Sequence, residues 1–555
     1  MRKKALLLAS TILALAASLP AQAQTSGALT GQVSSSEEGP MEGVLVSAKR
    51  EGSHFTTTVV SNDKGQFSFP AAKLEPGKYT ITIRAAGYIL ASPKTVDIGG
   101  SGGSGTAADI KLARAKSPIS QLSNAEWLIS VPGDDRLKSF LPDCVGCHTL
   151  QRVFTAPHDA EEWVQVFSRM GRYAPESTPA RPQLIVPGGA RSERPRVPAN
   201  AVKQASEFLA NVSLSNPDRP EYDFKTLPRP KGKATMVVIT EYDLPRKEAM
   251  PHDVVIDAEG HAWHTDFGAQ IIGELDPKTG KVVDHQLALL KPEQPKGSLD
   301  IELDPDGNLW VGMSYQGGVS KIDRKTGKVT AYPLNKEWQD NSTQTNMVTP
   351  TNMYVDNKVW MTDTSSRSFF RLDINSGEWE KVGVATAADG TQISGYGIPT
   401  DKDNNVYMLE FGNTRIARLD AKTKVAKIWS TPMVRSRPRR GRLDDAGNLW
   451  FAEFGGNGIG KFDPKTETIK EWKLQTPWSA PYDVAISKGT TEVWTGSMLS
   501  DQVSRLDTKT DEITSYLLPR PTNIRRVFVD SSGARPVLWF GNNHGATIVK
   551  VEPTD

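Results

Sequence analysis

The sequence predicts a multidomain, mainly β protein, in which a β-sandwich, a small all-α domain and a seven-bladed β-propeller follow one another. Three observations support this. Short segments of alternating apolar residues fill the N-terminal part, apolar residues then recur with a helical period, and from about residue 235 a unit of about 45 residues repeats. The expected boundaries are a signal peptide at 1–23 and domains at 24–114, 115–215 and 216–555.

The first 23 residues have the pattern of a secretory signal. Basic residues at 2–4 precede an apolar run over 5–19, and Ala21-Gln22-Ala23 forms a small-x-small cleavage site. The run is too short for a membrane-spanning helix, and no later stretch is long enough. We therefore expect an exported, periplasmic chain with no transmembrane segment in its mature form. The 66 basic and 64 acidic side chains nearly cancel, which argues against a nucleic-acid partner.

Residues 24–114 alternate with the period of half-buried strands, and turn clusters such as Asn62-Asp-Lys-Gly65 separate them. Together with Gly31-Gln-Val33, Pro76-Gly-Lys-Tyr79 and Ala86-Gly-Tyr88, this arrangement resembles the carboxypeptidase regulatory-like domain. The resemblance implies a small β-sandwich without catalytic residues. The expected strands cover Leu29–Val33, Val44–Ala48, Thr56–Val60, Phe67–Phe69, Tyr79–Ile83 and Ile110–Leu112.

The only two cysteines lie in Cys144-Val-Gly-Cys147-His148. Two thiols on one short turn can add to the vinyl groups of a haem, and the adjacent imidazole can bind the iron. A zinc site would need further Cys or His ligands at suitable spacing, a thioredoxin-like pair needs a βαβ context, and a disulfide across so short a loop would be strained. The pentapeptide therefore predicts covalently bound haem c, with His148 as an iron ligand.

The surrounding residues 115–215 favour helices. Asp159 and Glu162 form a capping box, after which Trp163, Phe167 and Met170 fall on one face, and a second helix is expected over 200–211. Haem motif, helix, methionine and C-terminal helix in this order resemble a small class I cytochrome c. The resemblance implies that Met170 is the second iron ligand, which suits an electron carrier.

Two alternatives to this ligand assignment stay open. Met170 could simply pack in the core, where methionine is a common gap-filler, and His158 could be the second ligand in its place.

The repeat that starts near residue 235 has a constant centre: an apolar strand, an aspartate, a turn, and a strand with an aromatic residue. Examples are Val255-Ile-Asp257 before Trp263 and Tyr354-Val-Asp356 before Trp360. Seven units of four strands predict a β-propeller. The last unit lacks its fourth strand and Val238–Leu244 stands alone before the first, so we expect this N-terminal segment to close the ring.

Within this repeat, Pro251-His252-Asp-Val-Val-Ile-Asp257, the following run to Asp266 and Ile272–Gly280 resemble the virginiamycin B lyase, or streptogramin lyase, propeller. The resemblance implies the fold more strongly than the activity, because propellers carry many chemistries.

Aligned repeats place charged and aromatic residues around the axial mouth, as a ligand site requires. The candidate catalytic residues are His252 and Asp266, with Glu410, Arg439 and Glu453 orienting a polar substrate. A neutral imidazole at His252 could act as a general base or bind a metal such as Mg²⁺. The plain alternative is a water-filled channel lined by structural ion pairs.

The resemblance also counts against lyase chemistry. The lyases use histidines at the strand starts of two neighbouring blades, whereas here the neighbours of His252 are Leu299 and Arg525, and Met250 stands where a glutamate is needed.

Three functions follow, the first favoured. The protein is a periplasmic haem protein of oxidoreductase or electron-transfer type that acts with a polar small molecule and a redox partner protein. Alternatively, it is a Mg²⁺-dependent lyase with an accessory haem domain, or a non-enzymatic binding or electron-docking module. No dinucleotide-binding fingerprint is present.

Overall fold

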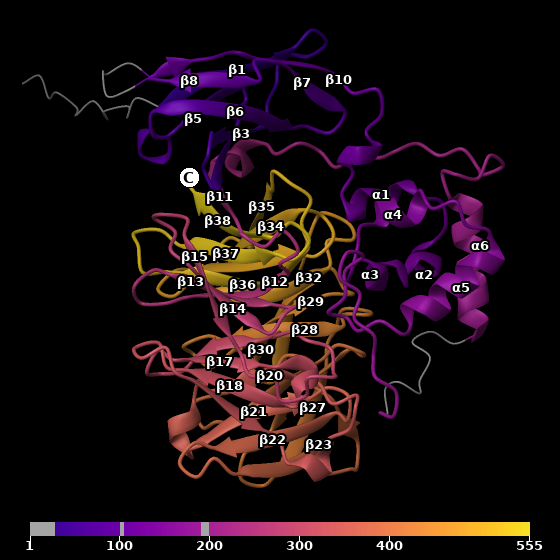
Figure 1. Cartoon of the computed structure of the whole chain (residues 1–555), viewed down its shortest axis with the longest axis vertical. Helices are drawn as coiled ribbons and strands as arrows, with labels where there is room; N and C mark the ends of the chain where they lie inside the picture. The colour runs from indigo at the N-terminus through magenta and orange to yellow at the C-terminus, as the bar shows by residue number, and fades with distance from the viewer. Residues whose placement is uncertain (1–27, 100–104, 190–198) are drawn as a thin grey trace, which may run out of the picture.

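The computed structural model describes residues 28–99, 105–189 and 199–555 (Figure 1). The expected signal peptide, residues 1–23, lies outside the described residues. Figure 1 shows the N-terminal β domain at one end of the long axis and a group of helices beside the large C-terminal ring of sheets. Within the described ranges, no helix has both the length and the apolar character needed to cross a membrane.

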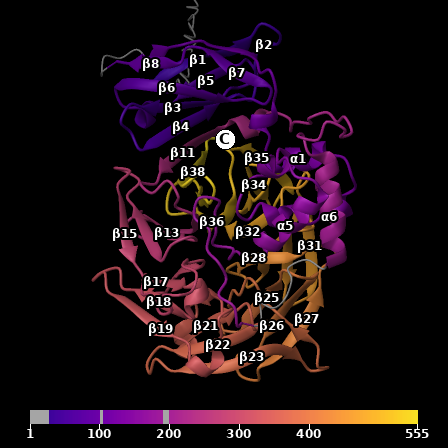
Figure 2. The ribbon, with the colours of Figure 1, turned by 45° about the vertical axis from the view of Figure 1, so that its right-hand side comes forward.

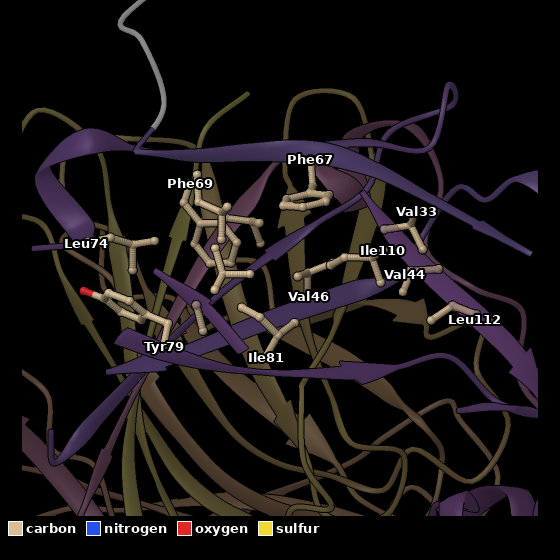
Figure 3. Close-up of a cluster of buried hydrophobic side chains, with 14 of the residues drawn as sticks. Val33, Val44, Val46, Phe67, Phe69, Leu74, Tyr79, Ile81, Ile110 and Leu112 are labelled. Carbon is tan, nitrogen blue, oxygen red and sulfur yellow. The ribbon is translucent and has the colours of Figure 1, made fainter. Parts of the chain in front are cut away.

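The N-terminal domain is a sandwich of two sheets. One has the order β2-β1-β10-β7, with β5 and β9 also pairing with β1, and the other contains β4-β3-β6-β8. Apolar side chains from both sheets, among them Val46, Phe67, Phe69, Ile81 and Ile110, fill the space between them (Figure 3). The strands are β1 Leu29–Ser35, β2 Gly39–Pro40, β3 Leu45–Arg50, β4 Phe55–Val60, β5 Gln66–Phe69, β6 Gly77–Arg84, β7 Tyr88–Ser92, β8 Thr95–Ile98, β9 Thr106–Ala107 and β10 Ile110–Arg114.

The helical domain begins with four short helices and continues with two longer ones. The expected capping box is present: the Asp159 carboxylate accepts a hydrogen bond from the Glu162 backbone, and the Glu162 side chain accepts one from the Asp159 backbone. A second capping box, Ser123 with Glu126, starts the first helix. The helices are α1 Asn124–Ser130, α2 Asp135–Lys138, α3 Leu141–Cys144, α4 Leu150–Phe154, α5 Ala160–Met170 and α6 Ala199–Val212.

The C-terminal part is a ring of seven units, as the repeat predicts; six have four paired strands, whereas the fourth has three, and its innermost segment pairs only through isolated bridges at Gly397 and Thr400. Most units form antiparallel sheets in simple sequence order, and the third and fourth are joined through β23 and β27. The strands are β12 Pro251–Ile256, β13 Ala262–Asp266, β14 Ile271–Leu275, β15 Val282–Gln286, β16 Ile301–Leu303, β17 Leu309–Gly312, β18 Gly318–Ile322, β19 Val329–Pro333, β20 Thr345–Thr349, β21 Lys358–Asp363, β22 Ser368–Asp373, β23 Trp379–Ala387, β24 Gln392–Ile393, β25 Val406–Glu410, β26 Arg415–Leu419, β27 Val425–Ser430, β28 Pro438–Leu443, β29 Leu449–Glu453, β30 Gly458–Asp463, β31 Thr468–Lys473, β32 Pro481–Ile486, β33 Glu492–Ser497, β34 Gln502–Asp507, β35 Glu512–Leu517, β36 Ile524–Asp530, β37 Val537–Asn542 and β38 Thr547–Pro553.

Ring closure follows the sequence prediction. The isolated strand β11, Val237–Asp243, pairs antiparallel with β38 and completes the last blade. The other edge of β11 pairs with β4 of the sandwich, from Val238 with Val59 to Tyr242 with Phe55. One continuous sheet of eight strands therefore runs from the seventh blade into the N-terminal domain, and the sandwich covers the outer edge of that blade.

The repeated aspartate and tryptophan have a structural explanation. The Trp263 indole donates a hydrogen bond to the Asp257 carboxylate at 2.7 Å, and Trp450 does the same to Asp444 at 2.9 Å. The third blade departs from the expected pattern. Its innermost strand is β20, and the segment expected as a strand around Tyr354 is a 3₁₀ turn, because Pro350 follows β20 directly and offers no N–H for continued pairing.

Candidate functional site

A cavity of about 1630 Å³ lies between the helical domain and one face of the propeller. Figure 2 shows helices α1, α5 and α6 beside the ring of sheets. The two parts share one apolar core, in which Leu141 and Val145 pack with Tyr482 and Met498 of the propeller. Among the residues that line the cavity, those that could bind a ligand or take part in a reaction include Cys144, Cys147, His148, His158 and Met170 from the helical domain, and Tyr396, Arg437, Arg439, Tyr482 and Arg525 from the propeller.

The pentapeptide wraps one tight turn at the end of α3. Backbone hydrogen bonds from Gly146 to Asp143 at 3.3 Å and from Cys147 to Cys144 at 3.4 Å hold the turn, so both half-buried thiols belong to one cavity wall. Burial raises the pKa of Cys144 to about 12 and lowers the pKa of His148 below its ordinary value. The turn therefore presents a protonated thiol at Cys144 and a neutral imidazole at His148, the form that binds iron.

Both candidate second ligands line the same cavity. Met170 is the last residue of α5 and is half-buried, whereas His158 precedes that helix and lies 3.6 Å from the Glu162 carboxylate. Apolar side chains such as Phe167 form much of the wall, and the buried Trp163 indole N–H has no hydrogen-bond partner among the residues that the structure describes. The donor set, the apolar wall and the unpaired indole fit a haem.

Two propeller residues bind the backbone of the pentapeptide. The Asn523 amide donates to the Val145 carbonyl at 3.0 Å, and the Arg525 guanidinium donates to the Gly146 carbonyl at 3.1 Å. Asn523 also holds Arg525 through its side-chain oxygen at 2.6 Å. These contacts fix the turn on the seventh blade. The sequence analysis did not identify Asn523, because a contact to a distant carbonyl leaves no local pattern.

Arg439, at the start of β28, is the candidate residue that faces the cavity most directly from the propeller. It is 8% exposed, and its guanidinium carbon lies 3.7 Å from the centre of the Tyr482 ring and 4.2 Å from that of Phe411. Tyr396 and Phe454 complete an aromatic box, with ring centres at 5.2 and 4.6 Å. The box holds a cation through ring faces rather than through a carboxylate.

His252 lies beneath this box. Its Nδ1 is 2.5 Å from the Asp253 carboxylate and its Nε2 is 3.3 Å from the Tyr482 hydroxyl, which is hydrogen-bonded to that of Tyr396. Burial lowers the pKa of His252 to about 4, so the imidazole is neutral at pH 7. Burial opposes ionisation of Tyr482, but the charges of Arg439 and two further arginines lower its pKa. His252 contacts the cavity wall and does not itself line the cavity.

The remaining candidates lie outside the cavity. Asp266 forms an ion pair with Arg246 and accepts a backbone hydrogen bond from Gly268 at 2.9 Å. Glu410 pairs with Arg415 at 2.6 Å. Glu453 is buried behind the cavity wall, near Glu471. The structure thus brings Arg439 and, through Tyr482, His252 toward the cavity, whereas Asp266 and Glu410 form ion pairs elsewhere and Glu453 is buried without a cation partner among the described residues.

The propeller axis contains a cluster of charges that the sequence analysis missed. Arg440 binds Asp253 at 2.7 Å and Asp300 at 2.6 Å, and Arg526 binds Asp300 at 2.9 Å. The signal was in the sequence: in His252-Asp253, Arg439-Arg440 and Arg525-Arg526, a charged residue follows the residue predicted at the mouth, and among these second residues Asp253 binds both arginines.

His252, the candidate ligand for Mg²⁺, and two of the carboxylates expected at the same mouth are engaged by other protein groups. Asp266 and Glu410 are each engaged by an arginine, and the Nδ1 atom of His252 is engaged by Asp253. Across the part of the chain that the structure describes, no three His, Cys, Asp or Glu side chains are grouped so that they could hold a metal ion. The side chains at these positions do not fit Mg²⁺.

Two family profiles match the chain. Residues 28–113 match the carboxypeptidase regulatory-like domain, and two overlapping segments, 289–494 and 388–555, match the virginiamycin B lyase family. The N-terminal sandwich is therefore similar to the carboxypeptidase regulatory-like domain, and most of the C-terminal ring is similar to the virginiamycin B lyase family.

Among solved structures, three are similar to part of this chain. A streptogramin B lyase is 21% identical with a TM-score of 0.48, over 57% of this chain and 98% of that one. Virginiamycin B lyase from Staphylococcus aureus is 19% identical with a TM-score of 0.48, over 57% and 99%. A catalytically inactive variant of that enzyme with quinupristin is 20% identical with a TM-score of 0.48, over 57% and 99%. No curated protein matches the sequence.

Proposed function

We propose that this chain is an exported, periplasmic haem protein of oxidoreductase or electron-transfer type, and that it binds a polar small molecule at the propeller side of the shared cavity. The observation that carries the proposal is the lining of this one cavity. The residues of the haem motif form one wall, and a cationic aromatic box of the propeller forms another.

The size of the cavity supports two occupants. Pockets for a single small molecule usually have about 300–1,000 Å³. At about 1630 Å³, this cavity has room for a ligand beside a haem.

Each residue has a role in this proposal. Cys144 and Cys147 would hold the haem covalently, with His148 and Met170 as iron ligands and His158 as the alternative to Met170. When bound, the haem supplies one-electron chemistry, which the protein directs by binding and orientation. Asn523 and Arg525 keep the pentapeptide on the propeller, and apolar side chains of the helices and the propeller pack together beside the cavity.

A pyridine haemochrome spectrum tests the haem. Protein made in a host that matures c-type cytochromes should give the spectrum of covalent haem, and its mass should exceed that of the polypeptide by one haem. Replacing both cysteines, Cys144→Ser with Cys147→Ser, should abolish the covalent mass, and wild-type protein from a host without the maturation system serves as the control. Colourless wild-type protein from the competent host would refute the proposal.

The lyase alternative makes a different prediction. A lyase with an accessory haem domain would turn over its substrate in a haem-free His148→Ala variant, and Asp266→Ala would abolish that turnover. A module that only docks a redox partner would show neither this turnover nor substrate-dependent reduction in anaerobic spectra. The proposed oxidoreductase should show reduction that depends on both the small molecule and His148.

A further inference from the structure

Arg439 is a buried cation without a counter-ion. Among the described residues, no carboxylate lies within ion-pair distance of it, its Nε–H has no hydrogen-bond partner, and its Nη1 contacts only the Met498 sulfur at 4.0 Å. Removing a charge from water costs several kcal/mol unless partners replace the lost hydration. Stacked rings contribute about 0.5–2 kcal/mol each and satisfy the faces of the guanidinium, not its N–H groups.

The rest of the cavity wall also has a net positive charge. Among its described residues, six arginine and lysine side chains line the cavity against two carboxylates, those of Asp143 and Glu176. Two of the six lie on the same side as Arg439: Arg437 donates to the Phe411 carbonyl, and Arg525 donates to Asn523 and Gly146. Neither forms an ion pair within the described ranges. An anion in this cavity would therefore meet excess positive charge.

We propose that the Arg439 box, formed by Arg439, Tyr396, Phe411, Phe454 and Tyr482, binds the carboxylate of an organic acid. Four rings surround the guanidinium, with centres 3.7–5.2 Å from its carbon. Rings do not accept hydrogen bonds as a carboxylate does, so a carboxylate entering from the cavity would accept two hydrogen bonds from the guanidinium. The apolar body of the acid would lie against the aromatic walls. This inference rests on the proposed function and names the chemical class of its ligand.

Two sources could supply the carboxylate: a propionate of the bound haem, or a diffusible acid that enters the cavity. The test uses benzoate as the anionic probe and benzamide as a neutral probe of nearly the same shape. Binding is measured by calorimetry on the full-length chain in its haem-free and haem-loaded forms. The midpoint potential of the loaded form is measured by spectroelectrochemistry.

The variant is Arg439→Gln, and its matched control is Arg418→Gln. Arg418 lies on β26, pairs with Asp401 at 3.0 Å and does not line the cavity. If a diffusible acid is the ligand, the loaded chain should prefer benzoate to benzamide. Arg439→Gln should then weaken benzoate binding by about 10- to 100-fold, as expected for the loss of hydrogen bonds to a charged group.

If a haem propionate is the ligand, only the haem-free chain should bind benzoate in an Arg439-dependent way. Arg439→Gln should then lower the midpoint potential of the loaded chain, because a positive charge near the iron is lost. The proposal is overturned if both forms bind benzoate no more tightly than benzamide and Arg439→Gln leaves the potential at the Arg418→Gln value. A chain that never acquires haem refutes the proposed function alone, because benzoate binding to that chain still tests the box.

Discussion

Glu453 offers a quantitative test of the propeller electrostatics. The residue ends β29, its side chain is fully buried, and among the described residues no cation pairs with it. Burial raises the pKa of this carboxyl from 4.5 to about 9, and the nearby Glu471 raises it further in the same direction. At neutral pH, the folded protein therefore keeps a proton on Glu453 that the unfolded chain releases.

The sign of the pH effect follows from this proton. Between pH 4.5 and 9 the folded state binds one proton more than the unfolded state, so the stability from Glu453 is complete below pH 4.5 and declines as the pH rises. A pH of 7 is 2.5 units above 4.5. At about 1.36 kcal/mol per unit, the release of this proton on unfolding lowers the free energy of unfolding by about 3 kcal/mol at that pH. Glu453→Gln has nearly the same shape and cannot ionise. It should match wild type at pH 5 and exceed its stability at pH 8.

The measurement is urea unfolding of the propeller, followed by tryptophan fluorescence at pH 5 and pH 8. Glu410→Gln is the matched control, because Glu410 has the same place at the end of β25 but forms an ion pair with Arg415. That variant should lose about 1–2 kcal/mol at both pH values. An equal fall in stability between pH 5 and pH 8 for wild type and Glu453→Gln would refute the reasoning.

Three further predictions concern the haem ligand, the axis and the domain contact. Met170→Ala should change the visible spectrum and lower the midpoint potential of the loaded protein, whereas His158→Ala should do neither; the reverse result would assign the ligand to His158. Arg440→Met should lower the free energy of unfolding of the propeller by about 3 kcal/mol in urea titrations, since it removes one of the two arginines that neutralise the buried Asp253 and Asp300 and leaves only Arg526 between them. Asn523→Ala removes the hydrogen bond to Val145 and should speed proteolysis of the helical domain, without altering the propeller transition; an unchanged digestion rate would contradict that role.

Features that depend on neighbouring residues were predictable from the sequence. The Asp159 capping box depends on a spacing of three residues, and the repeat of aspartate and tryptophan corresponds to a hydrogen bond within the first, second and fifth blades. Closure of the ring by β11 could be predicted by counting strands, because the last unit lacks one strand and a single strand precedes the first unit. These signals are local or periodic, so a single sequence contains them.

The contacts between distant residues could not be predicted. Glu410, at the end of β25, and Arg439, at the start of β28, were both expected at the axial mouth, yet Glu410 pairs with Arg415, whereas Arg439 has no carboxylate partner among the described residues and faces the cavity. The ion-pair partner of a charged side chain depends on the neighbouring blades and loops. The repeat period of the sequence does not determine which partner that is. The position of the helical domain is equally hard to predict. Asn523 binds it through the backbone carbonyl of Val145, and every residue has such a carbonyl.

The pairing of β4 with β11 has a practical consequence for work on fragments of this protein. A shortened chain that starts after residue 114 would expose the hydrogen-bonding groups of β11, from Val238 to Tyr242, along an apolar edge. Such an edge recruits strands from other molecules. Fragments of the ring should therefore be produced with the sandwich attached, or with a charged substitution on β11 that discourages self-association.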